Sequence, residues 1–123
     1  YQLDQRWDYG VINLCQIYNA LSMPERSLAL LGDAYLRGFN HTKLYENAGF
    51  AWFQQKDYRR ASQWYDKALI INPTPDNFKN LAVTHIYAGD LKRAAILLDA
   101  GLEQFPGNEL LQNNLTQLQS LVR

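Results

Sequence analysis

Two histidines and one cysteine are the side chains of this 123-residue chain best suited to catalysis. His41 stands in a stretch that we expect to be a loop, which indicates a solvated turn residue rather than a partner for His85. The chain has no glycine-rich phosphate loop, no His-x-x-x-His pair and no Gly-x-Ser-x-Gly motif. The sequence therefore predicts no active site, no cofactor and no metal centre.

Asparagine is the polar residue whose spacing carries most information. Asn13, Asn47, Asn80 and Asn114 recur at intervals of 34, 33 and 34 residues. An amide both donates and accepts hydrogen bonds, so a row of amides can hold the backbone of an extended peptide without reading its side chains. The alternative is that each amide bonds an adjacent helix. Each asparagine directly precedes an expected core residue: Leu14, Ala48, Leu81 or Leu115.

Composition narrows the class of partner. Twelve Lys and Arg balance twelve Asp and Glu, so no net field favours nucleic acid, an anionic membrane or a charged substrate. No apolar run reaches the roughly 20 residues that cross a bilayer. The single Cys15 excludes a disulfide framework. We expect one soluble domain over residues 1–123, cytoplasmic or periplasmic, from which a targeting segment can be missing because the sequence starts at Tyr1.

Apolar residues recur at three-and-four spacing along the whole chain, which predicts helices throughout. Ser22, followed by Glu25, predicts a capping box, and Gly38, Gly89 and Gly107 predict helix ends. The expected helices cover about residues 4–21, 24–37, 43–55, 58–71, 75–88, 91–104 and 109–122.

The helices repeat in pairs. Moving 33 residues forward aligns Ala61 with Ala94 and Pro73 with Pro106, and moving 34 residues back aligns Ala61 with Ser27. Three hairpins are expected, over about residues 8–41, 42–74 and 75–107, followed by a terminal helix over 109–122. Small residues admit a neighbouring backbone. We therefore expect a tight crossing at Gly49 and Ala61, surrounded by Tyr45, Trp52 and Tyr65.

This repeat resembles the tetratricopeptide repeat. The central hairpin has Tyr45-x2-Ala48-Gly49-x2-Trp52, then Ala61-x3-Tyr65, Ala68 and Pro73; the next has Phe78, Leu81, Ala82 and His85, then Ala94, Leu98, Gly101 and Pro106. The first hairpin is divergent, with Phe39 where proline is usual. The resemblance implies an all-α right-handed superhelix of stacked antiparallel hairpins. It also gives His85 and Cys15 packing positions, equivalent to Trp52 and Gly49.

In this family the first helix of each hairpin lines a concave groove. The resemblance therefore implies a peptide-binding set of Asn13, Gln16, Lys43, Asn47, Phe50, Phe53, Gln54, Lys79, Asn80, Val83, Ile86 and Tyr87. Tyr9, Ile12, Asn19 and Glu46 face the same groove in this scheme. The aromatic and apolar members would together expose an apolar patch, which is typical of an interaction site: Phe50, Phe53, Val83, Ile86 and Tyr87. The alternative is that another part of a longer chain, or a second copy, covers them.

Some family members grip a peptide's C-terminal carboxylate with a clamp of Lys and Asn, then Asn, then Lys and Arg. The corresponding residues here are Ile12, Gln16, Asn47, Asp76 and Asn80. Only Asn47 matches the clamp, and Asp76 stands where the clamp has a lysine. This comparison argues against a peptide ligand held by its C-terminal carboxylate. A hydrophobic or amphipathic segment is the better expectation.

The leading hypothesis is a non-catalytic protein-protein interaction module that binds a peptide or helix from an unidentified protein partner. A second hypothesis is a structural unit that associates with another copy of itself. A third is a regulatory segment of a larger multidomain protein or of a secretion or assembly complex. Fold alone does not decide among them, because function depends on the site.

Overall fold

The computed structural model describes residues 5–122, and the side chains of residues 9–122. Within this range the chain forms seven α-helices and no strand, which confirms the all-α expectation. None of these helices is long and apolar enough to cross a membrane. The helices are α1 (Gln5–Ala20), α2 (Pro24–Leu36), α3 (Thr42–Gln54), α4 (Tyr58–Ile71), α5 (Pro75–Tyr87), α6 (Leu91–Gln104) and α7 (Glu109–Leu121).

Side-chain caps begin most of the helices. The Asp57 carboxylate accepts the backbone N–H of Arg60 at 3.1 Å, and such a cap satisfies one of the donors that a helix start leaves unpaired. Thr74, Asp90 and Asn108 cap α5, α6 and α7 in the same way. The helix expected from about residue 43 begins at Thr42, and the Nδ1 atom of His41, which was expected in a loop, accepts the backbone N–H of Lys43 at 3.0 Å. His41 is therefore a helix cap.

The expected capping box at Ser22 is wrong. Met23 holds the N-cap position of α2 without a side-chain hydrogen bond, and Ser22 has a φ of 56°. The tight reversal after α1 explains this backbone. The Ser22 N–H bonds the Asn19 carbonyl at 3.1 Å and the Met23 N–H bonds the Tyr18 carbonyl at 2.8 Å. These bonds turn Ser22 into the left-handed conformation and away from a capping geometry.

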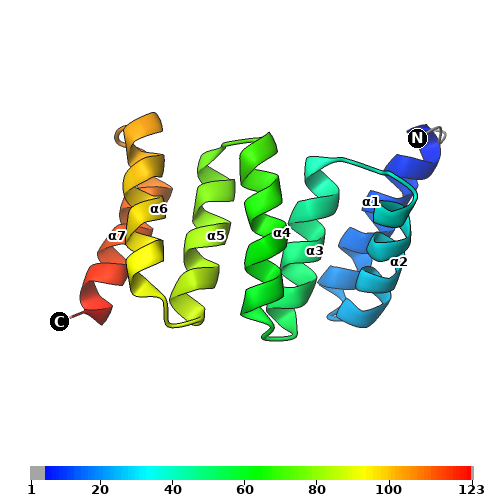
Figure 1. Ribbon diagram of the computed structural model, residues 1–123, viewed down its shortest axis with the longest axis horizontal. Helices are drawn as coiled ribbons and strands as arrows, with labels where there is room; N and C mark the ends of the chain where they lie inside the picture. Colours follow the sequence, from blue (N-terminus) through cyan, green and yellow to red (C-terminus); the bar gives the residue numbers. More distant parts are fainter. Residues whose placement is uncertain (1–4, 123) are drawn as a thin grey trace.

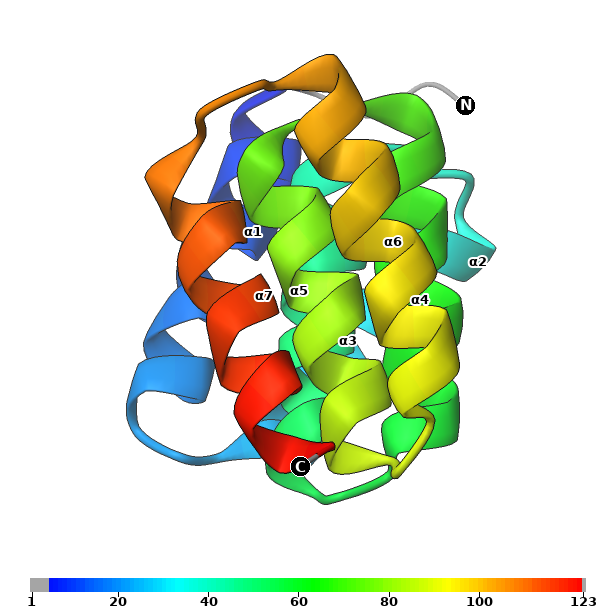
Figure 2. The same ribbon diagram turned by 90° about the vertical axis from the view of Figure 1, so that its left-hand side faces the viewer.

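The helices follow one another in chain order along the long axis of the molecule, and the two termini lie at opposite ends (Figure 1). The view along that axis shows two layers, with α1, α3, α5 and α7 in one and α2, α4 and α6 in the other (Figure 2). Within hairpins, α1 packs on α2, α3 on α4 and α5 on α6; between hairpins, α2 packs on α3, α4 on α5 and α6 on α7.

The apolar core runs through the stack as three clusters, one of them centred on Ala61, Tyr65 and Leu81. Ala61 is completely buried. At Gly49, a Cβ atom would lie 2.7–2.8 Å from atoms of the Tyr65 ring. The central hairpin is thus tightly packed at the expected place, with the Tyr65 ring as the neighbour that excludes a side chain at position 49.

Three residues of the first hairpin are placed differently from expectation. Leu14, expected in the core, is 39% exposed; it lies on α1, which together with α2 forms one end of the described stack (Figure 1). Ile12 and Asn19, expected to face the groove, are buried instead. Ile12 joins a core cluster that includes Leu44 of α3. The close packing of α3 on α1 explains both burials.

Candidate functional site

A pocket of about 130 Å³ lies between the first helices α3 and α5. Its lining residues are Phe50, Phe53, Tyr65, Lys79, Asn80, Val83 and Thr84. Five of these belong to the peptide-binding set expected from the sequence, and Tyr65 and Thr84 were not in that set. Phe50 is 43% exposed, so an aromatic edge at this pocket is open to solvent. We call it the α3–α5 pocket.

Three aromatic rings cluster at Phe53, and they come from three consecutive helices. The Phe53 ring centroid lies 5.1 Å from that of Tyr87 and 5.3 Å from that of Tyr58, both in edge-to-face geometry. Such pairs add roughly 0.5–1.5 kcal/mol beyond the area they bury. Phe53 is therefore held in place, while Tyr87 is 59% exposed. Tyr58 was missed by sequence reasoning, because it begins α4, a second helix.

Charge at the α3–α5 pocket comes from Lys79. On α3, the Lys43 ammonium pairs with the Glu46 carboxylate at 3.2 Å. Among the described residues no carboxylate lies within ion-pair distance of Lys79. Burial, and secondarily the charge of Glu46, raises the pKa of Tyr65. The Tyr65 hydroxyl therefore stays neutral at physiological pH, and Lys79 is the cation that an incoming ligand meets in this pocket.

The four repeated asparagines do not form one uniform row. The Asn47 side chain donates to the Lys43 carbonyl at 2.7 Å and accepts from Asn19 at 3.3 Å. Asn114 is buried and donates to the Leu110 carbonyl at 2.8 Å. Asn13 is exposed and Asn80 lines the α3–α5 pocket. Bonding to helices thus accounts for Asn47 and Asn114, and Asn80 is the amide of the row that lines the pocket.

The remaining members of the expected set lie outside the pocket lining. Gln16 is exposed on α1. Gln54 donates to the Asn19 carbonyl at 3.0 Å and so ties α3 to α1. Ile86 packs against the core cluster that contains Leu111 and Leu118 of α7. The structure therefore gathers Phe50, Phe53, Lys79, Asn80 and Val83 around one pocket, with Tyr87 beside it, and separates the others.

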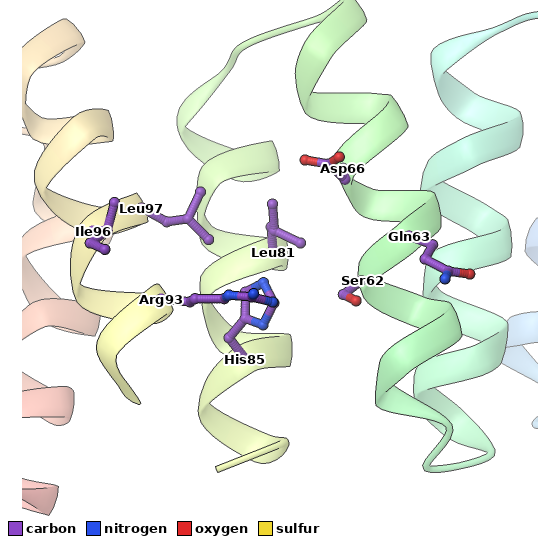
Figure 3. A pocket seen from close by; sticks show the side chains of 8 residues that line it. All are labelled: Ser62, Gln63, Asp66, Leu81, His85, Arg93, Ile96 and Leu97. Atoms are coloured by element: carbon purple, nitrogen blue, oxygen red, sulfur yellow. The ribbon is translucent and has the colours of Figure 1, made fainter. Parts of the chain in front are cut away.

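A larger pocket, of about 340 Å³, opens on the side of the second helices. Figure 3 shows its walls: Ser62, Gln63 and Asp66 come from α4, Leu81 and His85 from α5, and Arg93, Ile96 and Leu97 from α6. A similar pocket of about 280 Å³ is lined from α2, α3 and α4, with Trp52 and Arg60 at the positions equivalent to His85 and Arg93. Because it recurs, this hollow is a product of hairpin stacking rather than a dedicated site.

The side chains considered for catalysis have packing surroundings. Cys15 is fully buried, and burial raises the pKa of its thiol to about 11, opposed by a hydrogen bond to Ser27. A thiol with this pKa is not ionised at neutral pH and is a poor nucleophile. Burial lowers the pKa of His85, with Arg93 acting in the same direction and Asp90 and Asp66 opposing. Within the described residues, no His, Cys, Asp and Glu cluster could hold a metal ion.

Comparisons with known proteins agree with this architecture. Residues 42–75 match the tetratricopeptide repeat family model. The structure is similar to a thermophilic TPR protein of Thermus thermophilus, with a TM-score of 0.80 and 22% identity over 89% of this chain and 62% of that chain. It is also similar to the second TPR domain of human RPAP3, solved in complex with an HSP70 peptide, with a TM-score of 0.77 and 16% identity over 87% of this chain and 90% of that chain. No curated protein matches the sequence.

The family model covers the central hairpin, and the two solved structures cover most of the chain. The two solved structures show that the chain shares the all-α helical repeat fold of TPR proteins, and the match to the tetratricopeptide repeat model is to residues 42–75. The chain spans 62% of the length of the Thermus protein.

Proposed function

We propose that this chain is a non-catalytic protein-interaction module that binds a peptide segment at the α3–α5 pocket. The proposal rests on one observation: the Phe50 side chain is 43% exposed to solvent and lines a pocket together with Phe53 and Val83. The fold supports this proposal, since the similar RPAP3 domain was solved with a peptide bound.

The size and chemistry of the pocket define the ligand. An apolar cavity of about 150 Å³ accepts benzene, so a pocket of about 130 Å³ fits one aliphatic or aromatic side chain. Lys79 lines the same pocket without a carboxylate partner among the described residues. A segment with an apolar anchor next to an acidic residue would fill the pocket and pair with Lys79. Such a segment is amphipathic, as the sequence also led us to expect.

A displayed library of random peptides, selected on the chain, tests the proposal. The best selected peptide is then titrated into the Phe50→Ala and Lys79→Ala proteins and followed by fluorescence anisotropy. We expect Phe50→Ala to weaken binding about tenfold or more, because anchor residues dominate binding energy. Lys79→Ala should weaken binding less, and its effect should shrink as salt is added, since exposed charge pairs are screened.

Ile70→Ala and Ile96→Ala are the matched controls, because both remove an exposed isoleucine from second helices. Both controls should leave the dissociation constant within about twofold, since exposed positions outside an interface contribute little. Selection of no peptide at all, or equal affinity for the parent chain, Phe50→Ala and Lys79→Ala, would contradict the proposal.

A further inference from the structure

The Tyr65 hydroxyl is an unpaired polar group at the α3–α5 pocket. Tyr65 lines this pocket from α4 and is only 5% exposed. Its hydroxyl has no hydrogen-bond partner among the described residues, yet it is not sealed off from solvent. Buried hydroxyls are nearly always bonded to protein or to water. An unpaired hydroxyl that borders a pocket is therefore available to whatever group enters that pocket.

Packing fixes the position of the Tyr65 ring. A Cβ atom added at Gly49 would lie 2.7–2.8 Å from the Cγ, Cδ1 and Cε1 atoms of this ring, so one ring edge lies along the backbone of α3. Ala61 and Leu81 pack with the ring in the same core cluster. The phenol therefore reaches the pocket as a group already held in place, which loses little conformational freedom when a ligand binds.

Exposure separates the deep polar groups of the pocket from those at its rim. Lys79 and Asn80 are half-buried, whereas Tyr65 and Thr84 are buried. The Oγ1 atom of Thr84 already donates to the Asn80 carbonyl at 2.7 Å. The Tyr65 hydroxyl is thus the deep donor that remains free among the side chains lining the pocket, while Lys79 meets the charge of a ligand at the rim.

A ligand group that fills the pocket must satisfy this donor. A wholly apolar side chain would expel water from the hydroxyl and leave it unpaired, which is unfavourable. A carboxylate is also disfavoured, because burial and the charge of Glu46, which raise the pKa of Tyr65, act against another negative charge there. The complement is a neutral acceptor on an otherwise apolar group. The walls from Phe50 and Phe53 favour a ring that packs on them.

We propose that Tyr65 makes the α3–α5 pocket specific for a tyrosine anchor, whose ring contacts Phe50 and Phe53 and whose hydroxyl accepts a hydrogen bond from the Tyr65 hydroxyl. This inference rests on the proposed function and names the side chain that the pocket takes. Phenylalanine is rejected, because a site built to bond a polar group discriminates against the analogue that lacks it.

Two synthetic peptides test this specificity. Both carry the best sequence selected from the displayed library, with tyrosine at the anchor position in one and phenylalanine in the other. The anchor is the residue whose replacement by alanine weakens binding most. Fluorescence anisotropy gives the dissociation constants for the parent chain and for Tyr65→Phe. The parent chain should bind the tyrosine peptide about tenfold more tightly, since the phenylalanine peptide leaves a buried donor unpaired.

Tyr65→Phe should lose or reverse this preference, and it should bind the phenylalanine peptide more tightly than the parent chain does. Its melting temperature should stay near that of the parent chain, because the lost hydroxyl has no partner among the described residues. Tyr45→Phe is the matched control. Tyr45 is also buried, but its hydroxyl donates to the Asn40 side chain, and neither residue lines the pocket. This variant should keep the preference for the tyrosine peptide.

Three results would overturn the inference: equal affinity of the parent chain for both peptides, an unchanged preference in Tyr65→Phe, or a selected aliphatic anchor that binds more tightly than tyrosine at the same position. Phe50→Ala separates this failure from a failure of the proposed function. If Phe50→Ala weakens both peptides while the parent chain does not discriminate, the pocket binds peptide but Tyr65 does not select its anchor. If Phe50→Ala binds both peptides like the parent chain, peptides bind elsewhere and both proposals are wrong.

Discussion

Among single residues, Gly49 shows how directly the repeat pattern follows from packing. A Cβ atom there would lie 2.7–2.8 Å from three atoms of the buried Tyr65 ring. Cβ atoms in folded proteins essentially never come within 3.0 Å of such neighbours. We expect Gly49→Ala to lower the free energy of unfolding by about 1–3 kcal/mol through overpacking, although alanine itself favours helix. Urea denaturation measures the change.

Gly32 provides the matched control for Gly49, because it lies inside α2 and a Cβ added there would meet nothing within 4 Å. Gly32→Ala should therefore raise the free energy of unfolding by up to about 1 kcal/mol, the difference in helix propensity. If Gly49→Ala were as stable as Gly32→Ala, the Tyr65 ring would have to move freely, and the proposed tight packing of the central hairpin would be wrong.

His85 couples stability to pH. Burial lowers its pKa in the folded protein below the ordinary value of 6.5, so the unfolded chain binds the proton more readily. Unfolding free energy therefore falls as pH drops through the ordinary pKa, and the loss is complete below the folded pKa. We expect His85→Gln to lose less stability than the parent chain between pH 8 and pH 5. Chemical denaturation at both pH values measures this, and equal losses would exclude a role for His85.

At the scale of helices, the sequence predicted the number and approximate bounds of the elements. The spacing of apolar residues and the glycines that end helices can both be recognised within short stretches of sequence. Cap residues were predicted less well. His41, which was expected in a loop, caps α3. Ser22, which was expected to begin a capping box, caps nothing. The outcome at Ser22 depends on the reversal between α1 and α2, which links backbone groups that no local pattern pairs.

The residues of the candidate site were also predicted where local position sufficed and missed where the packing of one helix on another decides. The rings of Phe50 and Phe53 were predicted as site residues from their places on a first helix, and both line the α3–α5 pocket. The hydrogen bond from Asn19 to Asn47 was not predicted, because it depends on how close α1 lies to α3. Tyr58 was missed for the same reason, since its contact with Phe53 crosses from one helix to the next. The use of these side chains in binding stays a prediction.

Over the whole molecule, each hairpin packs mainly on its neighbours. Stability in such a stack is roughly a sum of hairpin and interface contributions, so the ends open more easily than the middle. We expect amide hydrogen exchange to be slowest in α3, α4 and α5, and faster in α1, whose end face no described helix covers. A single exchange rate shared by all protected amides would instead show that the chain opens only as a unit.

The placement of the tryptophans has an optical consequence. Trp52, with the Arg60 guanidinium 4.9 Å from its ring centroid, and Trp64, stacked on Tyr45 at 5.9 Å, both belong to the α3–α4 hairpin, whereas Trp7 lies in α1. Most of the intrinsic fluorescence therefore comes from the middle of the molecule. Far-ultraviolet circular dichroism, by contrast, weights every helix by its length. When thermal unfolding is followed by both signals, the difference between the two midpoint temperatures measures how independently the outer hairpins unfold.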